Sequence, residues 1–313
     1  MNVLLLPHLK IHNANAFSSP FTIGFPAMTA WLGFVHALER KLSQAGLSDL
    51  MLHSAAVVSH RCDVQTYKDE GDFVNSILGT RNPSIFDGQF KKKYGSRYQS
   101  KFEAPLTSPS FIEEPRCHLD VSLVIEWSGN EDQVQQSDFT QQLQAVIATM
   151  KVAGGDVLSF GKPSVKSVIT EQDTAQVLGQ LMPGYVLIER RDLMIDAMQQ
   201  GDDAIDALLG YLTVHHHCKQ LEDQSVVWHS QRKTSGWIVP IATGFQGISK
   251  LGEAKNQRDP SVPHRFAESV VTLGEFVMAH KIKHLDDILW QYHPDLENDL
   301  YLCQPVNAIN EHQ

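Results

Sequence analysis

Closely spaced cysteines and long apolar runs are both missing from this chain of 313 residues. Its four cysteines form no CxxC pair, which excludes a zinc ribbon and a dense disulfide framework. No run approaches the ~20 apolar residues of a membrane span. The first six residues also lack the basic flank and cleavage site of a signal peptide. We therefore expect a cytoplasmic protein with no membrane partner.

Common catalytic signatures are absent as well. The sequence contains no GxSxG, GxxxxGK[ST] or HExxH pattern, so we predict no catalytic residue and no cofactor. Metal-free RNA cleavage needs only a positioned base and acid, and the chain has fifteen histidines. A metal-independent endoribonuclease is therefore the alternative to a binding protein.

One histidine tract invites a metal hypothesis. The residues are His215, His216, His217 and Cys218, whose imidazole and thiolate groups are zinc ligands. Adjacent residues on a helix point in different directions, however, and no second cluster with ligand spacing accompanies the tract. We interpret it as a helix end near solvent and predict no metal site.

A net charge of −10 excludes a protein that coats nucleic acid over its whole surface, because such binding depends on neutralising phosphates with Lys and Arg. Any nucleic-acid site must be local. Between residues 81 and 102 the only acid is Asp87, and aromatic residues alternate with six cations: Arg81, Lys91, Lys92, Lys93, Arg97 and Lys101. This composition predicts a clamp on single-stranded RNA, in which each stacked base contributes ~1–3 kcal/mol. A solvated loop or a docking site for an acidic partner is the other interpretation.

Hydrophobic periodicity predicts the order of the elements. Apolar residues at helical spacing follow Pro26, and an alternation broken only at Val124 marks residues 117–127 as a half-buried strand with one wet face. The expected elements are a strand at 3–11, a helix at 26–42, strands at 53–65 and 117–127, a helix from Ser137 to Met150, and a strand at 184–188.

This order, strand, helix, strand, strand, helix, strand, predicts an α+β protein with a ferredoxin-like core of the kind that RNA-recognition modules share. We assign residues 1–190 to the core, with residues 67–115 as a basic insertion between its second and third strands. Residues 191–313 form a mixed C-terminal extension. Helices are expected in it near 192–199, 202–217, 264–280 and 284–292, with an apolar segment at 236–242. The fold alone does not define a function.

The loop after the first strand offers polar ligands. Asn13, Asn15, Ser18 and Ser19 carry amides and hydroxyls that bind phosphates and base edges. The same residue types build turns and cap helices, so a purely structural loop is the competing interpretation.

Two further pairs are candidate RNA ligands. Gly154 and Gly155 follow a predicted helix and are either its C-cap or a glycine loop on which an RNA backbone rests. His60 and Arg61 lie near the end of the second strand, where they face RNA or are merely exposed polar residues of an open sheet.

The opening stretch, LLLPHLKIHNANAFSSPFTIGFPAMTAWLGFVHALER, resembles the start of the second Csy subunit of type I-F CRISPR surveillance complexes, the Cas-five-type tail proteins. Further motifs follow in the family's order: TRNP with DG, HLDVSL, AGG, LMPG, GWIVP, RF with LGE, and DILW. The resemblance spans nearly the whole chain. The stretch from Lys91 to Phe111 is longer and more basic than is usual in the family.

The resemblance implies a RAMP-type core and a non-catalytic subunit of an antiviral ribonucleoprotein. Such a subunit binds the 5′ handle of the CRISPR RNA, pairs with the large tail subunit and contacts the first backbone subunit of the Csy complex. Target DNA is a further candidate partner. Arg81 and Asn82 belong to the family-like Arg-Asn-Pro motif and are the RNA ligands that we favour most in the basic insertion.

Overall fold

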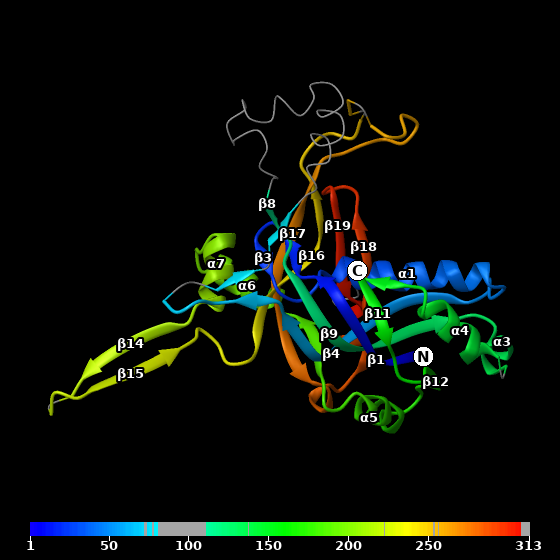
Figure 1. Ribbon diagram of the computed structural model, residues 1–313, viewed down its shortest axis with the longest axis horizontal. Helices are drawn as coiled ribbons and strands as arrows, with labels where there is room; N and C mark the ends of the chain where they lie inside the picture. Colours follow the sequence, from blue (N-terminus) through cyan, green and yellow to red (C-terminus); the bar gives the residue numbers. More distant parts are fainter. Residues whose placement is uncertain are drawn as a thin grey trace, which may run out of the picture.

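In the part of the chain that the structure describes, one large antiparallel sheet carries helices on both of its faces and is accompanied by four separate two-stranded sheets (Figure 1). The computed structural model describes residues 1–71, 74–76, 78–80, 111–136, 138–221, 223–252, 254–255 and 257–307. None of the helices in these ranges combines the length and the hydropathy that a bilayer span requires.

The elements have the following bounds. The strands of the large sheet are β1 (Asn2–Asn15), β4 (Met51–Val64), β9 (Arg116–Ser128), β10 (Lys151–Val152), β11 (Gly155–Ser159), β12 (Ser164–Ser167), β13 (Tyr185–Glu189), β16 (Ile238–Gly247), β17 (Ala267–Met278), β18 (Trp290–Asp295) and β19 (Leu300–Pro305). The two-stranded sheets pair β2 (Phe17–Ser19) with β3 (Thr22–Ile23), β5 (Thr66–Tyr67) with β6 (Asn75–Ser76), β7 (Leu78–Thr80) with β8 (Phe111–Glu113), and β14 (His215–Gln220) with β15 (Val226–Gln231). The helices are α1 (Met28–Gln44), α3 (Glu131–Gln135), α4 (Phe139–Ile147), α5 (Glu171–Gln180), α6 (Arg191–Gln199) and α7 (Ala204–Leu212), with short 3-10 turns η3 (Ala279–Lys281) and η4 (Leu285–Asp287).

The strand order is β10-β11-β1-β9-β4-β13-β17-β16-β19-β18, and β12 pairs with the far end of β1. The outer edge of β4 is shared by two strands. Val58 and Ser59 pair with β13, whereas Ala55 pairs with Trp290 of β18. The pairings therefore return to β4 and join the C-terminal strands to the N-terminal ones in a closed circuit.

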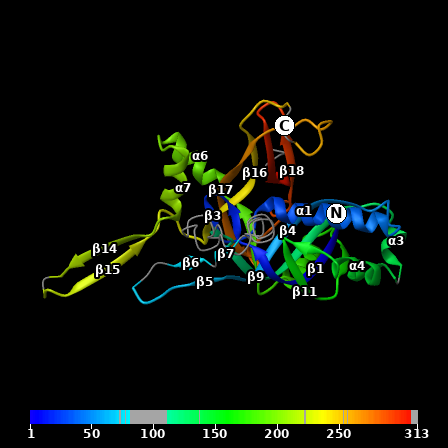
Figure 2. The ribbon, with the colours of Figure 1, turned by 45° about the horizontal axis from the view of Figure 1, so that its top comes forward.

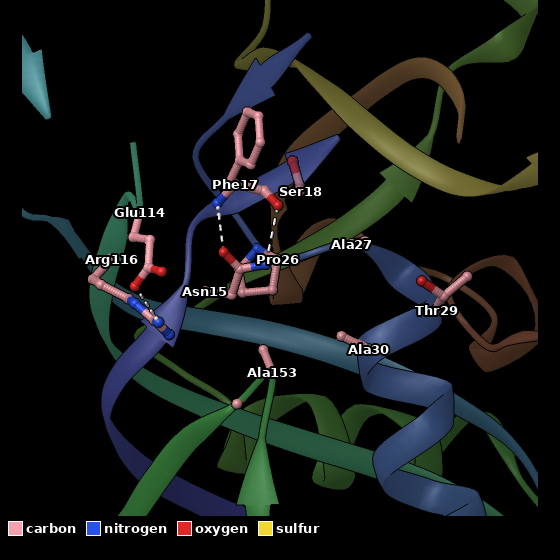
Figure 3. A pocket seen from close by; sticks show the side chains of 11 residues that line it. Asn15, Phe17, Ser18, Pro26, Ala27, Thr29, Ala30, Glu114, Arg116 and Ala153 are labelled. Carbon is pink, nitrogen blue, oxygen red and sulfur yellow. Dashed lines mark hydrogen bonds and ion pairs between the residues drawn. The ribbon is translucent and has the colours of Figure 1, made fainter. Parts of the chain in front are cut away.

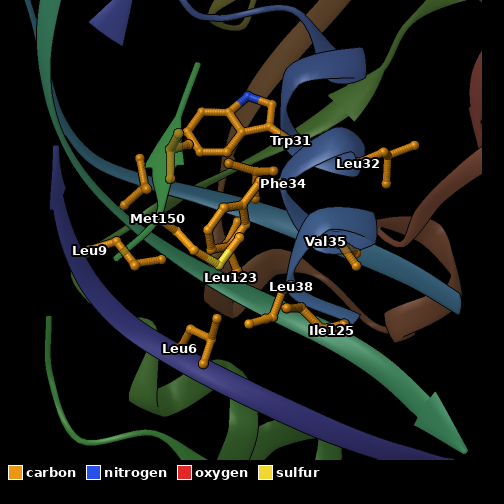
Figure 4. Close-up of a cluster of buried hydrophobic side chains, with 14 of the residues drawn as sticks. Leu6, Leu9, Trp31, Leu32, Phe34, Val35, Leu38, Leu123, Ile125 and Met150 are labelled. Carbon is orange, nitrogen blue, oxygen red and sulfur yellow. The ribbon is translucent and has the colours of Figure 1, made fainter. Parts of the chain in front are cut away.

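The main core lies between the sheet and the helices α1 and α4 (Figure 4). The predicted stripe on α1 is confirmed, since its members are all buried: Met28, Trp31, Val35, Leu38 and Leu42. The helix begins at Met28 rather than at Pro26. Pro26 lies just before the N-cap, and its carbonyl accepts a hydrogen bond of 3.2 Å from the Trp31 indole.

A second cluster covers the opposite face of the sheet. It joins Val3, Ala56 and Val124 to α5 and to the segment around η3 and η4. The wet face predicted for residues 117–127 is for this reason only partly exposed: Ser122 and Val124 are buried, while Asp120 remains partly exposed. A third, smaller cluster packs α6 and α7 on β16 and β17.

Several sequence predictions need correction. The strand predicted at 184–188 is present as β13, but it pairs with β4 and β17, whereas β11, which follows α4 in the chain, pairs with β1. The segment predicted as a helix at 264–280 is mainly the strand β17, because Val270, Val271 and Thr272 are β-branched and favour a pleated sheet. The predicted helix at 284–292 is likewise a 3-10 turn followed by a strand.

The histidine tract is also an exposed strand rather than a helix end. Helix α7 stops at Leu212, and residues from His215 onward form β14 of a hairpin that extends away from the sheet in both views (Figures 1 and 2). Successive side chains of a strand point to opposite faces. His216 accordingly contacts Ser230 at 2.8 Å, while the rings of His215 and His217 lie 6.3 Å apart.

Trp290 closes the circuit of strands. Its side chain is fully buried, and its indole N–H donates to the Leu187 carbonyl at 3.1 Å. Replacing Trp290 with Ala should lower the free energy of unfolding by about 3–5 kcal/mol through lost burial and an uncollapsed cavity. The matched change Trp228→Ala, at an exposed tryptophan on β15, should alter it by no more than about 0.5 kcal/mol. Urea unfolding measures both, and equal losses would contradict this role of Trp290.

Candidate functional site

A cavity of 740 Å³ opens where β1 ends and α1 begins (Figure 3). It brings together four segments: residues 15–18 at the end of β1, the start of α1, residues 114–116 at the start of β9, and the β10–β11 turn. The residues that line it are Asn15, Phe17, Ser18, Pro26, Ala27, Thr29, Ala30, Glu114, Arg116, Ala153 and Gly154. Of the sequence-predicted ligands, Asn15, Ser18 and Gly154 meet here.

The N-terminus of α1 supplies positive potential to this cavity. Its N-cap is Ala27, whose side chain cannot accept a hydrogen bond from the backbone N–H groups of the first turn, and no acid occupies that turn. Ala27, Thr29 and Ala30 line the cavity. Because the first N–H groups of a helix lack intrahelical acceptors and lie at the positive end of its dipole, this end favours an anion.

Arg116 is the cation of the cavity and was missed by the sequence analysis. It starts β9 directly opposite Asn15 in the register with β1. Its guanidinium pairs with Glu114 at 3.2 Å and retains further donors. The available signal was a cation just before a strongly alternating strand. The first residue of such a strand lies where the strand leaves the sheet, so its side chain can reach a loop or a ligand.

Asn15 itself has a structural role. Its side-chain amide donates to the Phe17 carbonyl and accepts from the Phe17 N–H, both at 3.0 Å. These bonds fix the turn into β2 and leave the amide little freedom to read a base. The turn chemistry that competed with RNA contact in the sequence analysis is thus present at Asn15.

The two predicted glycines have different environments. Ala153 and Gly154 form the two-residue turn between β10 and β11, and both have positive φ (48° and 75°), as a type I′ turn requires. A Cβ on Gly154 would meet nothing within 4 Å, so its backbone borders open space in the cavity. A Cβ on Gly155 would lie 2.7 Å from backbone atoms of β1, so Gly155 permits close packing of β11. Neither caps a helix, since α4 ends at Ile147.

Asn13 and Ser19 line neither this cavity nor the next. Asn13 lies at a bulge of β1 with φ of 56°, and its side-chain oxygen accepts from Gln65 at 2.9 Å. Ser19 is buried, and its hydroxyl contacts Thr22 at 2.7 Å. Ser18 also contacts the Thr22 hydroxyl, at 2.8 Å, and remains partly exposed between the two cavities.

A second cavity, of 400 Å³, lies on the other side of the β2–β3 hairpin. Ser18 lines both cavities, and the consecutive residues Phe25 and Pro26 line one each. The full lining of the second cavity is Ser18, Thr22, Ile23, Gly24, Phe25, Ser59, His60, Arg61, Cys62, Val64, Tyr185, Trp237, Val239, Pro240 and Phe276. The predicted ligands His60 and Arg61 belong to it.

His60 and Arg61 differ in how strongly they are held. The ring nitrogens of His60 contact the Pro183 carbonyl at 2.6 Å and the Ser122 hydroxyl at 2.7 Å, and the ring stacks on His8 at 4.2 Å. The side chain of Arg61 is 72% exposed and pairs with Asp63 at 2.5 Å. The hydrogen bond with Asp63 raises the pKa of Arg61. His60 is therefore fixed in a polar network, whereas Arg61 can reach a ligand.

The histidine network contains metal-ligating residue types. His8, His60 and Asp120 each place one potential ligand atom within 4.8 Å of the others. These atoms already have partners in the protein, since His8 contacts Asp120 at 3.0 Å and both ring nitrogens of His60 are engaged. The group holds together through its own hydrogen bonds.

The remaining predicted ligands fall in the basic insertion. Arg81, Asn82, Lys91, Lys92, Lys93 and Arg97 lie outside the described residues. The described groups around the two cavities include backbone N–H groups, hydroxyls, guanidinium groups and aromatic rings, beside the Glu114 carboxylate and aliphatic side chains. The first four kinds are the groups that bind phosphates and unpaired bases.

Comparison with known proteins agrees with the sequence motifs. Residues 4–303 match the family described as CRISPR-associated protein (Cas_Csy2). The chain is 30% identical to the CRISPR-associated protein Csy2 of Pseudomonas aeruginosa (strain UCBPP-PA14), over 96% of this chain and 94% of that protein. The resemblance to a Csy protein of the type I-F system is thereby confirmed. The chain belongs to the Csy2 family of CRISPR-associated proteins.

Proposed function

We propose that this chain is a non-catalytic subunit of the type I-F CRISPR (Csy) surveillance complex and binds the 5′ handle of the CRISPR RNA. The observation that carries the proposal is the first cavity. There the uncapped N-terminus of α1, Arg116 and the open backbone of Gly154 surround one space in a chain of net charge −10. A local concentration of anion-binding groups in an acidic protein suits one short RNA segment rather than general RNA binding.

The same proposal includes a ferredoxin-like RAMP core. Strands β11, β1, β9 and β4 are adjacent in that order, and α1 and α4 share one hydrophobic cluster on one face. In chain order these elements are strand, helix, strand, strand, helix, strand, which is the split βαββαβ unit. Its fourth strand is then β11, whose turn from β10 presents Gly154 to the first cavity.

Protein partners form the second part of the proposal. The exposed side chains beyond residue 190 include Ile195 on α6 and Ile205 and Leu209 on α7. Exposed apolar groups of this size mark interfaces. We propose that this region contacts the large tail subunit and that the opposite end of the molecule contacts the first backbone subunit of the complex. The complex is expected in the cytoplasm. Target DNA is a further candidate ligand.

The alternative function, metal-independent cleavage of repeat RNA, needs a histidine with a free ring nitrogen. The stacked pair of His8 and His60 is the most compact histidine group in the described residues, and both ring nitrogens of His60 already contact protein atoms. This favours binding over cleavage. Incubation of the purified chain with repeat RNA in chelator should leave the RNA intact, and specific cleavage lost on His60→Ala would favour the enzyme.

Arg116 provides the first test of RNA binding. Replacing Arg116 with Ala should weaken binding of 5′ handle RNA and reduce the slope of log K against log salt concentration by about 1, because one phosphate contact is removed. Fluorescence anisotropy across a salt series measures the slope. Lys281→Ala removes an exposed cation that lines neither cavity and should leave the slope unchanged. Equal effects of the two changes would show that the first cavity does not bind the RNA.

The basic insertion provides a second, sequence-based test. Replacing Arg81, Lys91, Lys92 and Lys93 together with Ala should reduce retention of the CRISPR RNA, and the loss should grow with salt concentration because the contacts are electrostatic. Co-purification of RNA with the complex, washed at increasing salt, measures retention. Unchanged retention across the series would show that the insertion does not hold RNA.

A further inference from the structure

The second cavity has an aromatic wall that ends in solvent. The indole of Trp237 is 51% exposed and packs against Tyr185 at 5.2 Å and Phe276 at 5.0 Å between ring centroids. Phe276 in turn contacts Phe25 at 5.3 Å, which stacks on the buried Trp31 at 5.3 Å. The exposed ring is therefore supported by a continuous series of rings that reaches the main core.

The backbone also fixes the position of Trp237. Gly236 precedes it with φ of 107°, a conformation that favours glycine, and the space of its missing Cβ is taken by the Glu275 carboxylate. The Trp237 carbonyl accepts from the Phe276 N–H at 3.1 Å. A large aromatic ring held rigidly at the surface loses little conformational entropy when a ligand stacks on it.

The lining of the cavity also includes a cation and a hydroxyl. Arg61 reaches solvent there, next to His60 and Ser59, while Ser18 of the β2–β3 hairpin supplies a partly exposed hydroxyl. An exposed aromatic ring in a cavity that also holds a cation and a hydroxyl fits a nucleotide, whose base stacks while its phosphate and base edges are hydrogen-bonded. An apolar peptide or lipid chain would offer no acceptor to Arg61 or Ser18.

The two cavities adjoin each other at the β2–β3 hairpin. Ser18 borders both, and Phe25 and Pro26 border one each. A strand whose phosphate lies at the N-terminus of α1 can therefore place a neighbouring base beside Trp237 without leaving the surface.

We propose that the second cavity holds one unstacked base of the RNA strand whose backbone lies in the first cavity, with the base stacked on Trp237 and Arg61 contacting an adjacent phosphate. This inference rests on the proposed function. Stacking recognises the aromatic character of a base more than its identity, so the site positions the strand and contributes little sequence preference.

An abasic scan tests this inference. Wild-type chain is titrated, by fluorescence anisotropy, against 5′ handle RNA and against a set of RNAs in which each nucleotide in turn lacks its base. We expect one position at which removal of the base weakens binding by about 5- to 150-fold, the effect of losing one aromatic stack. The Trp237→Ala variant should bind intact RNA more weakly by a similar factor and be insensitive to base removal at that position.

Trp228→Ala is the matched control, because Trp228 is 66% exposed and lies on β15 rather than at the cavity. It should bind RNA as the wild type does and show the same sensitive position. Trp237→Phe retains a ring and should preserve most of the affinity, which separates stacking from a general loss of structure. The scan with the wild-type chain needs no variant and stands if Trp237→Ala does not fold.

The outcomes are distinguishable. In one outcome the intact RNA binds and every abasic RNA binds equally well. In another, base removal and Trp237→Ala weaken binding independently. Either result would show that the cavity holds no base, so the inference would fail while RNA binding would stand. If the wild-type chain binds no 5′ handle RNA at all, the proposed function fails, and this inference fails with it.

Discussion

The antiparallel pairing of β1 with β9, and of β9 with β4, is the interaction on which the rest of the structure depends. β9 is buried along most of its length and holds the other two strands in register. That register places Arg116 opposite Asn15 at the end of β1, and Arg61 opposite Asp120. Both cavities lie around the ends of these strands. The binding groups are thus positioned by hydrophobic burial in the central ladder and not by contacts among themselves.

Electrostatics complements this framework. The chain is acidic overall, so the proposed RNA binding relies on places where helix N–H groups and cations converge. In the first cavity the N-terminus of α1 contributes the positive end of the helix dipole without a charged side chain. The positive charge of Arg116 is partly neutralised by Glu114. In the second, Arg61 is partly balanced by Asp63 in the same way. Paired cations bind a phosphate less strongly than free ones, which agrees with the proposed function of retaining one RNA end while discriminating against bulk RNA.

The sequence predicted the long elements of the N-terminal half better than the short ones and those of the C-terminal part. β1, α1 and β9 were found from their patterns and β4 from a less regular run, whereas the long strand β17 was predicted as a helix. Helix α5 was missed, although Thr170 and Asp173 form a capping box at its start. β10 and β11 are too short for periodicity, so Gly154 was interpreted as a helix C-cap or an RNA-binding glycine loop, and the hairpin turn was not predicted. The cavities combine Thr29, Arg116 and Trp237 from distant parts of the chain, and only tertiary packing brings such residues together. Asn13, Ser19 and Gly155 were selected by residue type, and the structure engages them in turns and packing.

We propose above all that the 5′ handle of the CRISPR RNA lies along the two cavities at the β2–β3 hairpin. Photocrosslinking of 5′ handle RNA carrying a reactive base, within the assembled complex, tests it most directly when the crosslinked peptides are identified by mass spectrometry. The account predicts crosslinks in this chain to peptides that contain Ser18, Arg116 or Trp237. Crosslinks confined to other subunits, or in this chain only to the β14–β15 hairpin, would contradict it.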